Sequence, residues 1–385
     1  MQKGRVIVAL FTGITTLCVA LTILISSCRS DKKSSVVVAI VSSLTGDLAE
    51  NGIDIANGAR MALEEALADG NLKGREITIK LFDDEADPKV AVSTANRICQ
   101  DDKIVAVIGP LTSGCASAAA PVYERCHMPV VMPVPTNPEI TQKGRQDLFR
   151  IPPTDDKQAP FLAEYLLSHD ASAAVAVVHD MTTYGEGFAR AFQKAFVDGG
   201  GKVVAFEGSD ASNRDYRTVI TRLKSLGPKY ILLGATYDMG APFVRQMREL
   251  GLNAAVLAGD GCYGSQFLKL AGSAAEGTTV SFIAPDPSSS DKTAAFFSRY
   301  ESKYGKVVSF APLGFDAGLV IAKALSEMRE LRREEIVKTL HSPQFELEGV
   351  TGRIKFAENG DNLYATLVLY KVENGKWVLL KRPTQ

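Results

Sequence analysis

The chain lacks the motifs by which many enzymes of its length are recognised. Its 385 residues include only four histidines, at scattered positions, and none has the HExxH spacing of a zinc site. It has no GxSxG nucleophile elbow and no P-loop lysine. It also has no CxxC pair, which argues against a zinc ribbon or a thioredoxin-type site. We therefore expect a protein that is not an enzyme and needs neither a cofactor nor a metal.

An excess of charge of either sign is also missing. Lys and Arg number 43, Asp and Glu number 44, and the formal net charge is −1. A balanced surface does not favour nucleic acid or an anionic membrane as partner, so we expect no nucleic-acid binding. Hydrophobic residues make up 46% of the chain, as in an ordinary soluble protein, and the length suits two lobes better than one core.

The N-terminus has the plan of an export signal. Lys3 and Arg5 precede an apolar run that ends at Ile25, and two serines then precede Cys28. This ending resembles the lipobox of bacterial lipoproteins, which implies a signal peptide over residues 1–27, a lipid on Cys28 and a linker over residues 28–35. The alternative is an uncleaved membrane anchor, since about 20 apolar residues can span a bilayer. Either interpretation places the body of the protein outside the cytoplasm, in the periplasm or at the cell surface.

Four cysteines follow Cys28, at positions 99, 115, 126 and 262. An exported protein can form disulfides. The first three fall in one strand–helix neighbourhood, so one bridge among them is a reasonable interpretation. The alternative is that they are buried as small hydrophobic side chains, and the sequence does not decide between the two.

Strand-like segments alternate with helical segments along two successive stretches. In the first stretch we expect strands at 36–41, 76–82, 105–108 and 129–132, and helices at 58–69, 88–99 and 114–125. In the second we expect strands at 173–178, 202–206, 230–233 and 255–258, and helices at 158–167, 187–197, 216–226 and 242–250. This alternation predicts an α/β fold of two Rossmann-like lobes with parallel-rich sheets. Near the C-terminus, Asn-Gly pairs at 359–360 and 374–375 predict turns between extended segments.

Ligands of open α/β sheets bind outside the carboxyl ends of the strands. In the first stretch, Thr112 and Ser113 follow a strand and open a helix, whose free N–H groups suit a carboxylate. Ser113 has no motif nearby that supplies a base, and a helix cap is the alternative role for it. Thr136 follows the next strand in a proline-rich loop that can also present backbone carbonyls.

The second stretch adds aromatic, hydroxyl and acidic candidates. Tyr184, Thr236 and Tyr237 each follow a predicted strand, and Asp260 lies between two glycines after another. Asp260 can face a cationic group of a ligand, although Asp-Gly is also common in turns. An anion site on one lobe and an acid on the other predict that a zwitterion is captured between them.

Several motifs, in order, resemble the periplasmic solute-binding proteins of the branched-chain amino acid (leucine/isoleucine/valine) type. The resemblance extends from Val36 to Gly375, and its motifs are Leu44-Thr-Gly46, Asp83-Asp-Glu-Ala-Asp87-Pro88, Ile108-Gly-Pro-Leu-Thr-Ser113, Thr136-Asn-Pro-Glu139-Ile-Thr141, His179-Asp, Tyr184-Gly-Glu-Gly187 and Ala274-Ala-Glu276-Gly277. It implies a type I periplasmic binding fold whose hinge has three crossings, near 152–154, 283–285 and 350–354. The first lobe would comprise 36–153 and 284–351, and the second 154–283 and 352–385.

The resemblance also implies roles for the candidates. Ser113 and Thr136 would hold the carboxylate of an amino acid and share its ammonium with the carbonyl of Val134. Asp260 would pair with the ammonium. Tyr184 and Thr236, or Tyr237 in place of the latter, would close the second lobe over the ligand.

Two positions depart from the family pattern. Asn51 stands where an aromatic often packs on the ligand, and Asp260 is one methylene shorter than the usual glutamate. Phe310 matches an aromatic near the ligand side chain, with a core role as the alternative. The positions of the family's disulfide hold Ala86 and Thr112 here, so any bridge must be a different one.

These inferences predict a monomeric, lipid-anchored receptor that binds an amino acid or a related zwitterion and delivers it to the permease subunits of an ABC importer. The alternative with the same fold is a sensor that reports an amide, urea or amino acid to a regulatory partner. A structural lipoprotein without a ligand is a third possibility. The sequence does not name the ligand.

Overall fold

The computed structural model describes residues 35–70, 72, 76–210, 212–328, 330 and 332–381. The predicted signal peptide, the lipidation site Cys28 and all but the last residue of the 28–35 linker lie outside these residues. Among the residues described, no helix combines the length and the apolar character needed to cross a membrane.

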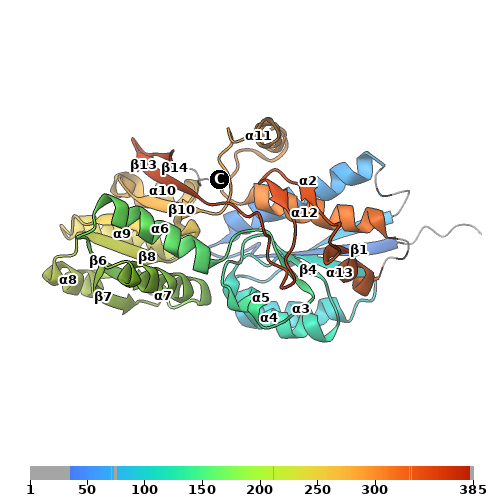
Figure 1. Ribbon diagram of the computed structural model, residues 1–385, viewed down its shortest axis with the longest axis horizontal. Coiled ribbons are helices and arrows are strands. Elements are labelled where there is room, and N and C mark those ends of the chain that lie inside the picture. Colours follow the sequence, from blue (N-terminus) through green and yellow to red (C-terminus); the bar gives the residue numbers. More distant parts are fainter. Residues whose placement is uncertain are drawn as a thin grey trace, which may run out of the picture.

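The molecule consists of two lobes side by side, each built on its own sheet (Figure 1). The first sheet has the strand order β2-β1-β3-β4-β5, and all its pairs are parallel. Its strands are β1 (Ser35–Ser42), β2 (Glu76–Asp83), β3 (Ile104–Ile108), β4 (Val130–Met132) and β5 (Leu148–Arg150). The predicted α/β class and the parallel pairing are confirmed in this lobe.

Helices cover both faces of the first sheet. Val38 and Ile40 of β1 pack under α2 and α12, whereas Val37 and Ala39 point to the opposite face, under α3 and α4. The helices of this lobe are α2 (Ala49–Ala68), α3 (Pro88–Cys99), α4 (Ser113–Arg125), α5 (Glu139–Gln142), α11 (Asp291–Tyr304), α12 (Ala311–Glu327) and α13 (Arg333–Leu340). Both faces of β1 are buried, which explains its continuous β-branched sequence.

The second sheet has the order β14-β13-β10-β9-β8-β6-β7. Its parallel strands are β6 (Ala174–His179), β7 (Lys202–Gly208), β8 (Tyr230–Gly234), β9 (Ala255–Ala258) and β10 (Thr279–Phe282), and the hairpin of β13 (Val368–Glu373) and β14 (Lys376–Lys381) is added antiparallel to β10. The helices are α6 (Asp155–His169), α7 (Thr183–Asp198), α8 (Arg217–Leu226), α9 (Tyr237–Glu249) and α10 (Ser265–Ala271), with 3-10 turns at Asp260–Cys262 and Gly272–Ala275. The Asn374-Gly375 turn between β13 and β14 is confirmed.

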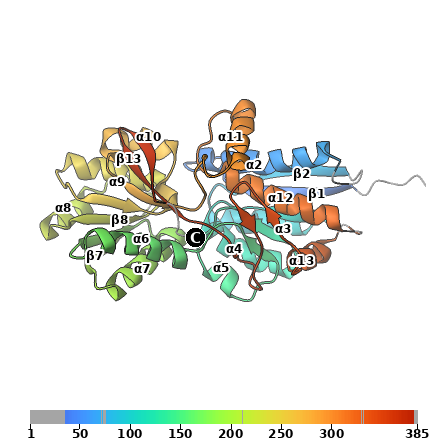
Figure 2. The same cartoon turned by 45° about the horizontal axis from the view of Figure 1, so that its top comes forward.

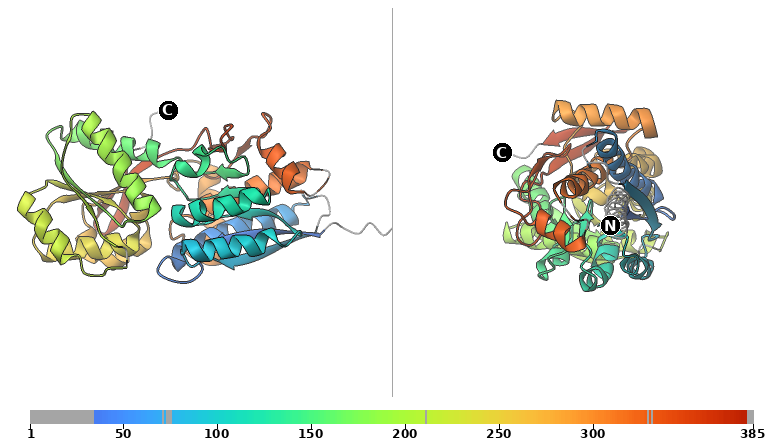
Figure 3. Two further views of the ribbon diagram at one scale, coloured as in Figure 1. Left: turned by 90° about the horizontal axis from the view of Figure 1, so that it is seen from below. Right: turned by 90° about the vertical axis from the view of Figure 1, so that its right-hand side faces the viewer.

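The chain passes between the lobes three times, as Figures 2 and 3 show. The first passage lies between β5 and α6 and the second between β10 and α11. The third comes later than predicted. Residues 353–363, which include β12 (Arg353–Ile354), pair with β11 (Leu347–Glu348) and with β5, so the passage to β13 follows Leu363.

The first lobe is tied to these late residues by backbone pairing. The amide of Arg150 donates to the carbonyl of Gly360 at 2.9 Å, and the amide of Asn362 donates to the carbonyl of Arg150 at 3.2 Å. A Cβ on Gly360 would lie 1.9 Å from the carbonyl oxygen of Leu148. The Asn359-Gly360 turn therefore serves close packing on β5, which the local sequence pattern did not indicate.

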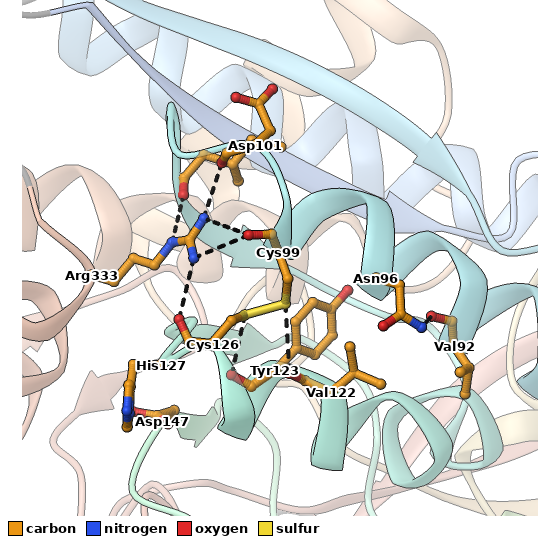
Figure 4. The surroundings of a disulfide bond; sticks show 11 residues. Val92, Asn96, Cys99, Asp101, Val122, Tyr123, Cys126, His127, Asp147 and Arg333 are labelled. Carbon is orange, nitrogen blue, oxygen red and sulfur yellow. Dashed lines mark hydrogen bonds and ion pairs between the residues drawn. A yellow bond between two sulfur atoms is a disulfide. The ribbon is translucent and has the colours of Figure 1, made fainter.

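One disulfide joins Cys99 to Cys126, with Cα atoms 5.8 Å apart, at the ends of α3 and α4 (Figure 4). Cys115 and Cys262 are buried free thiols. Arg333 of α13 donates to the carbonyls of Cys126 and Asp101, at 3.2 and 3.0 Å. One guanidinium thus satisfies carbonyls at the C-terminal ends of two helices that the disulfide holds together. Among the first three cysteines, Cys99 and Cys126 form one bridge and Cys115 is a buried thiol. Each of the two interpretations therefore holds for part of the set.

Candidate ligand-binding site

A cavity of about 570 Å³ lies between the lobes. The N-terminal ends of α2, α4, α7 and α9 converge on it. The residues that line it are Gly46, Asp47, Leu48, Asn51, Glu85, Ala86, Pro88, Leu111, Thr112, Ser113, Gly114, Val134, Pro135, Thr136, Met181, Thr182, Thr183, Tyr184, Thr236, Asp238, Asp260, Gly261 and Phe310. All ten predicted ligand residues except Tyr237 are among them.

Ser113 is not the cap of α4. The cap is Thr112, whose hydroxyl accepts a hydrogen bond from the amide of Cys115 at 3.2 Å. The Ser113 hydroxyl instead accepts from the amide of Asn137 at 3.3 Å and lines the cavity. The start of the helix and this hydroxyl together offer donors to an anion.

The loop that carries Thr136 is held by a buried cation, Arg150, which the sequence analysis did not single out. Its guanidinium donates to the carbonyls of Pro135 and Asn137 at 3.0 and 2.9 Å, and it forms an ion pair with Asp361 at 2.9 Å. Arg150 has no exposed surface, and burial lowers its pKa. Arginine near the end of a strand carries no local signal of such a role, because its partners come from distant loops.

Asn51 and Phe310 meet on the first-lobe side of the cavity. Asn51 lies in the first turn of α2, which begins nine residues earlier than the helix predicted at 58–69. Its Oδ1 accepts from the hydroxyl of Ser309 at 3.1 Å. Phe310 stacks on Phe282 with ring centroids 5.7 Å apart and also lines the cavity, so its core and cavity roles coexist.

Asp54, one turn after Asn51, fixes this corner. Its carboxylate accepts hydrogen bonds from four consecutive backbone amides, those of residues 308–311, at 2.8 to 3.1 Å. Tyr300 donates to it at 2.9 Å. Burial raises the pKa of Asp54, although these donors oppose the shift. Ser309 and Phe310 are thereby held against α2.

On the second-lobe side, the hydroxyl of Tyr184 donates to Oδ1 of Asp260 at 3.1 Å and accepts from the amide of Gly261 at 3.0 Å. Asp260 is 3% exposed. A Cβ on Gly259 would lie 2.5 Å from the Tyr184 hydroxyl oxygen. The glycines beside Asp260 therefore serve the approach of Tyr184, and Asp260 lines the cavity in a short 3-10 turn.

A second buried acid, Asp155, lies near Asp260. It is the first residue of α6, directly after the first passage between lobes, and neither of its carboxylate oxygens has a well-formed hydrogen bond. Burial, with the negative charge of Asp260, raises the pKa of Asp155 to about 8. Burial also raises the pKa of Asp260 to about 6. Near neutral pH the pair therefore carries about one negative charge.

Thr236 lines the cavity, whereas Tyr237 has a different role. Tyr237 is buried, and its hydroxyl donates to the backbone carbonyl of Asp47 on the first lobe at 2.6 Å. Arg214 of the second lobe forms an ion pair with the Asp47 side chain. Of the two candidates, Thr236 is the residue at the cavity and Tyr237 forms a contact between the lobes.

Three further acidic side chains on the cavity wall were not among the predicted ligand residues. Asp47, Glu85 and Asp238 line it together with Asp260, and no Lys, Arg or His among the described residues does so. Each of these acidic residues follows a strand, at the carboxyl edge of the sheet, where ligands of open α/β folds bind. Within the described part of the chain, no cluster of three or more His, Cys, Asp or Glu side chains could hold a metal ion.

Comparisons with known proteins agree with this geometry. A family model described as periplasmic binding protein matches residues 35–376. A Leu/Ile/Val-binding protein homolog of Brucella melitensis is 30% identical over 342 residues, which cover 89% of this chain and 91% of the relative. A leucine-, isoleucine-, valine-, threonine- and alanine-binding protein of Pseudomonas aeruginosa is 30% identical over 84% of this chain and 86% of the relative.

Solved structures show the same fold. A leucine binding protein from Thermotoga maritima superposes with a TM-score of 0.83 at 27% identity, covering 90% of this chain and 98% of that one. A branched-chain amino acid transporter substrate binding protein from Streptococcus pneumoniae, in complex with isoleucine, gives 0.81 at 25% identity, covering 91% and 100%. Sequence motifs, two-lobed fold and interlobe cavity agree, and the chain belongs to the periplasmic binding protein family.

Proposed function

We propose that this protein binds an amino acid in the cavity between its lobes and delivers it to the permease of an ABC importer. The observation that carries the proposal is the polarity of the cavity. The hydroxyls of Ser113 and Thr136 and the N-terminus of α4 line the first-lobe side of the cavity of about 570 Å³. The buried carboxylate of Asp260 lines the second-lobe side. A carboxylate suits the first face and an ammonium suits the second.

Each predicted ligand residue except Tyr237 keeps a role in this proposal. Ser113, Thr112 and Thr136 hold the ligand carboxylate, and the carbonyl of Val134 shares the ammonium with Asp260. Tyr184 orients Asp260, and Thr236 closes from the second lobe. Asn51 and Phe310 face the ligand side chain.

Closure follows from where these groups lie. A ligand that contacts both lobes binds the closed arrangement more tightly than the open one, so it shifts the population toward closure. Direct contacts between lobes, such as Tyr237 with Asp47, then add to the closed state. The closed form would dock on the permease as a monomer, and the ATPase subunits are separate chains.

Export and anchoring complete the proposal. The signal over residues 1–27 and Cys28 would hold the protein outside the cytoplasm by a lipid. The disulfide between Cys99 and Cys126 agrees with an oxidising compartment. Mass spectrometry of the membrane fraction tests the lipid: a diacylglyceryl mass on Cys28, absent in Cys28→Ser, is the expected result.

Isothermal titration of the purified protein with single amino acids tests ligand binding. At 100 times its dissociation constant, a ligand also adds about 2.7 kcal/mol of stability, which a thermal shift detects. We expect at least one α-amino acid to bind, and its amide and its deaminated acid to fail. A panel in which no zwitterion binds would overturn the proposal.

A further inference from the structure

We propose that the ligand is an amino acid whose side chain carries a hydrogen-bond donor and no negative charge, with side-chain amines preferred over aliphatic groups. This inference rests on the proposed function and specifies the ligand class of the same cavity. Two independent observations carry it: a buried amide on the cavity wall and the distribution of charge around it.

The buried amide is Asn51. It is 4% exposed and lines the cavity, and only its Oδ1 has a hydrogen-bond partner among the described residues, the hydroxyl of Ser309. A hydroxyl can donate or accept, so the amide can offer either its nitrogen or its oxygen to the ligand. A leucine side chain placed here would leave that polar atom dry and unpaired, which is costly.

Asn51 is not free to turn away from the cavity. Hydrogen bonds from four backbone amides to the Asp54 carboxylate hold residues 308–311 against the first turn and a half of α2. Ser309 is therefore fixed beside Asn51. The Asn51 amide is therefore held in place as part of the cavity wall.

The charges select the kind of polar group. Of the four carboxylates on the wall, Asp260 faces the proposed ammonium and Asp47 forms an ion pair with Arg214. Asp238 and Glu85 form no ion pair among the described residues. Because none of the described residues on the wall is basic, the electrostatic field favours a ligand of net positive charge and opposes an acidic side chain.

The apolar part of the wall fits the rest of such a ligand. Leu48, Leu111 and Phe310 line the same cavity. They can cover the methylene groups of lysine or ornithine while the terminal amine reaches the acidic residues. A donor-bearing side chain thus uses both the apolar and the polar surface that the cavity offers.

The test is isothermal titration of the purified protein with ornithine, lysine, glutamine, threonine, leucine, glutamate and putrescine. We expect the best donor-bearing amino acid to bind at least tenfold more tightly than leucine, and glutamate to show no binding. Asn51→Leu should shift the ratio toward leucine by at least tenfold. Asp238→Asn should weaken lysine or ornithine more than glutamine, and Asp215→Asn, an exposed acid outside the cavity, serves as the matched control.

The outcomes separate this inference from the function on which it rests. Leucine, isoleucine or valine binding more tightly than every donor-bearing amino acid would overturn the inference and leave the amino acid receptor intact. Asp238→Asn keeps the test valid if Asn51→Leu does not fold, because an unchanged lysine-to-glutamine ratio would also contradict it. Binding of putrescine alone, or of no amino acid, would overturn the receptor proposal itself.

Discussion

The two faces of the cavity are built on different principles. The first-lobe face offers neutral donors, at Ser113 and Thr136, and rests on buried ions, Arg150 and Asp54, that hold its loops. The second-lobe face offers carboxylate itself, at Asp260. At Ser113 and Thr136 the first face offers hydroxyl donors on loops held by these ions, whereas the second presents the buried carboxylate of Asp260, which forms no ion pair among the described residues. A ligand cation is therefore needed most where the second lobe closes, which couples binding to closure.

The sharpest way to break this comparison is to remove the charge from the second face. Asp260→Ala should weaken ligand binding at least about thirtyfold, because truncating one partner of a buried charge pair costs about 2–5 kcal/mol. Titration calorimetry with the best-binding amino acid measures the loss. A reduction no larger than that of the control Asp215→Asn would show that the ammonium binds elsewhere.

In the absence of ligand, the buried acids on the second-lobe side should lower the stability of the protein as the pH rises. The pKa of Asp155 in the fold, about 8, exceeds its ordinary value of 3.8, so the folded state binds a proton that the unfolded state has lost. The contribution of Asp155 to the free energy of unfolding is then largest at low pH and falls as the pH rises toward 8, by up to about 1.4 kcal/mol per pH unit. Asp155→Asn removes this fall. Between pH 6 and pH 8, the free energy of unfolding of the parent should therefore decrease by about 2 kcal/mol more than that of the variant. Urea unfolding at the two values measures it, and parallel slopes would contradict the assignment.

Affinity should depend on pH through Asp260. Its pKa of about 6 means that about nine-tenths of the carboxyl is protonated at pH 5. Ligand binding should therefore weaken about tenfold between pH 7.5 and pH 5, since only the ionised form pairs with ammonium. Asp260→Asn should bind weakly with a flat profile over this range. A parent profile equally flat would place the charge on another group.

The neutral donors of the first face should matter less singly. Ser113→Ala and Thr136→Val each remove one hydroxyl, and a hydrogen bond to a charged group contributes about 1.5–3 kcal/mol. We expect losses of about ten- to 150-fold at each position, from calorimetry under the same conditions. Ser168→Ala, an exposed serine on α6, is a matched control that should change nothing.

The smallest expected effect is on the contact between lobes outside the ligand. Arg214→Ala removes an exposed ion pair with Asp47, and such pairs contribute about 0–1 kcal/mol. Affinity should fall less than about fivefold, and less still at high salt, because salt screens the pair in the parent. A larger loss would mean that closure depends on direct contacts as much as on the ligand.

Much of the fold followed from local pattern. The strands predicted for the two sheets, Val36–Val41 among them, lie within about two residues of observed strands, because burial on both faces demands a continuous apolar run. The buried strands β5 and β10 were not predicted. The start of α2 was missed, since Glu50, Asn51 and Asp54 interrupt the apolar pattern of its first two turns. The third passage between lobes was placed too early, because the pairing of residues 353–363 with β5 is a long-range choice.

The sequence by itself determined the α/β alternation, the polar residues at the strand ends, and the opposition of a donor-rich loop and an acid, because these depend on periodicity and on chain order. Only the tertiary structure decided which cysteines pair, that Thr112 and not Ser113 caps α4, and that Tyr237 joins the lobes. It also revealed Arg150, Asp54 and Asp155, whose partners lie on other segments of the chain. Burial and charge pairing arise when distant segments meet, so no local pattern records them.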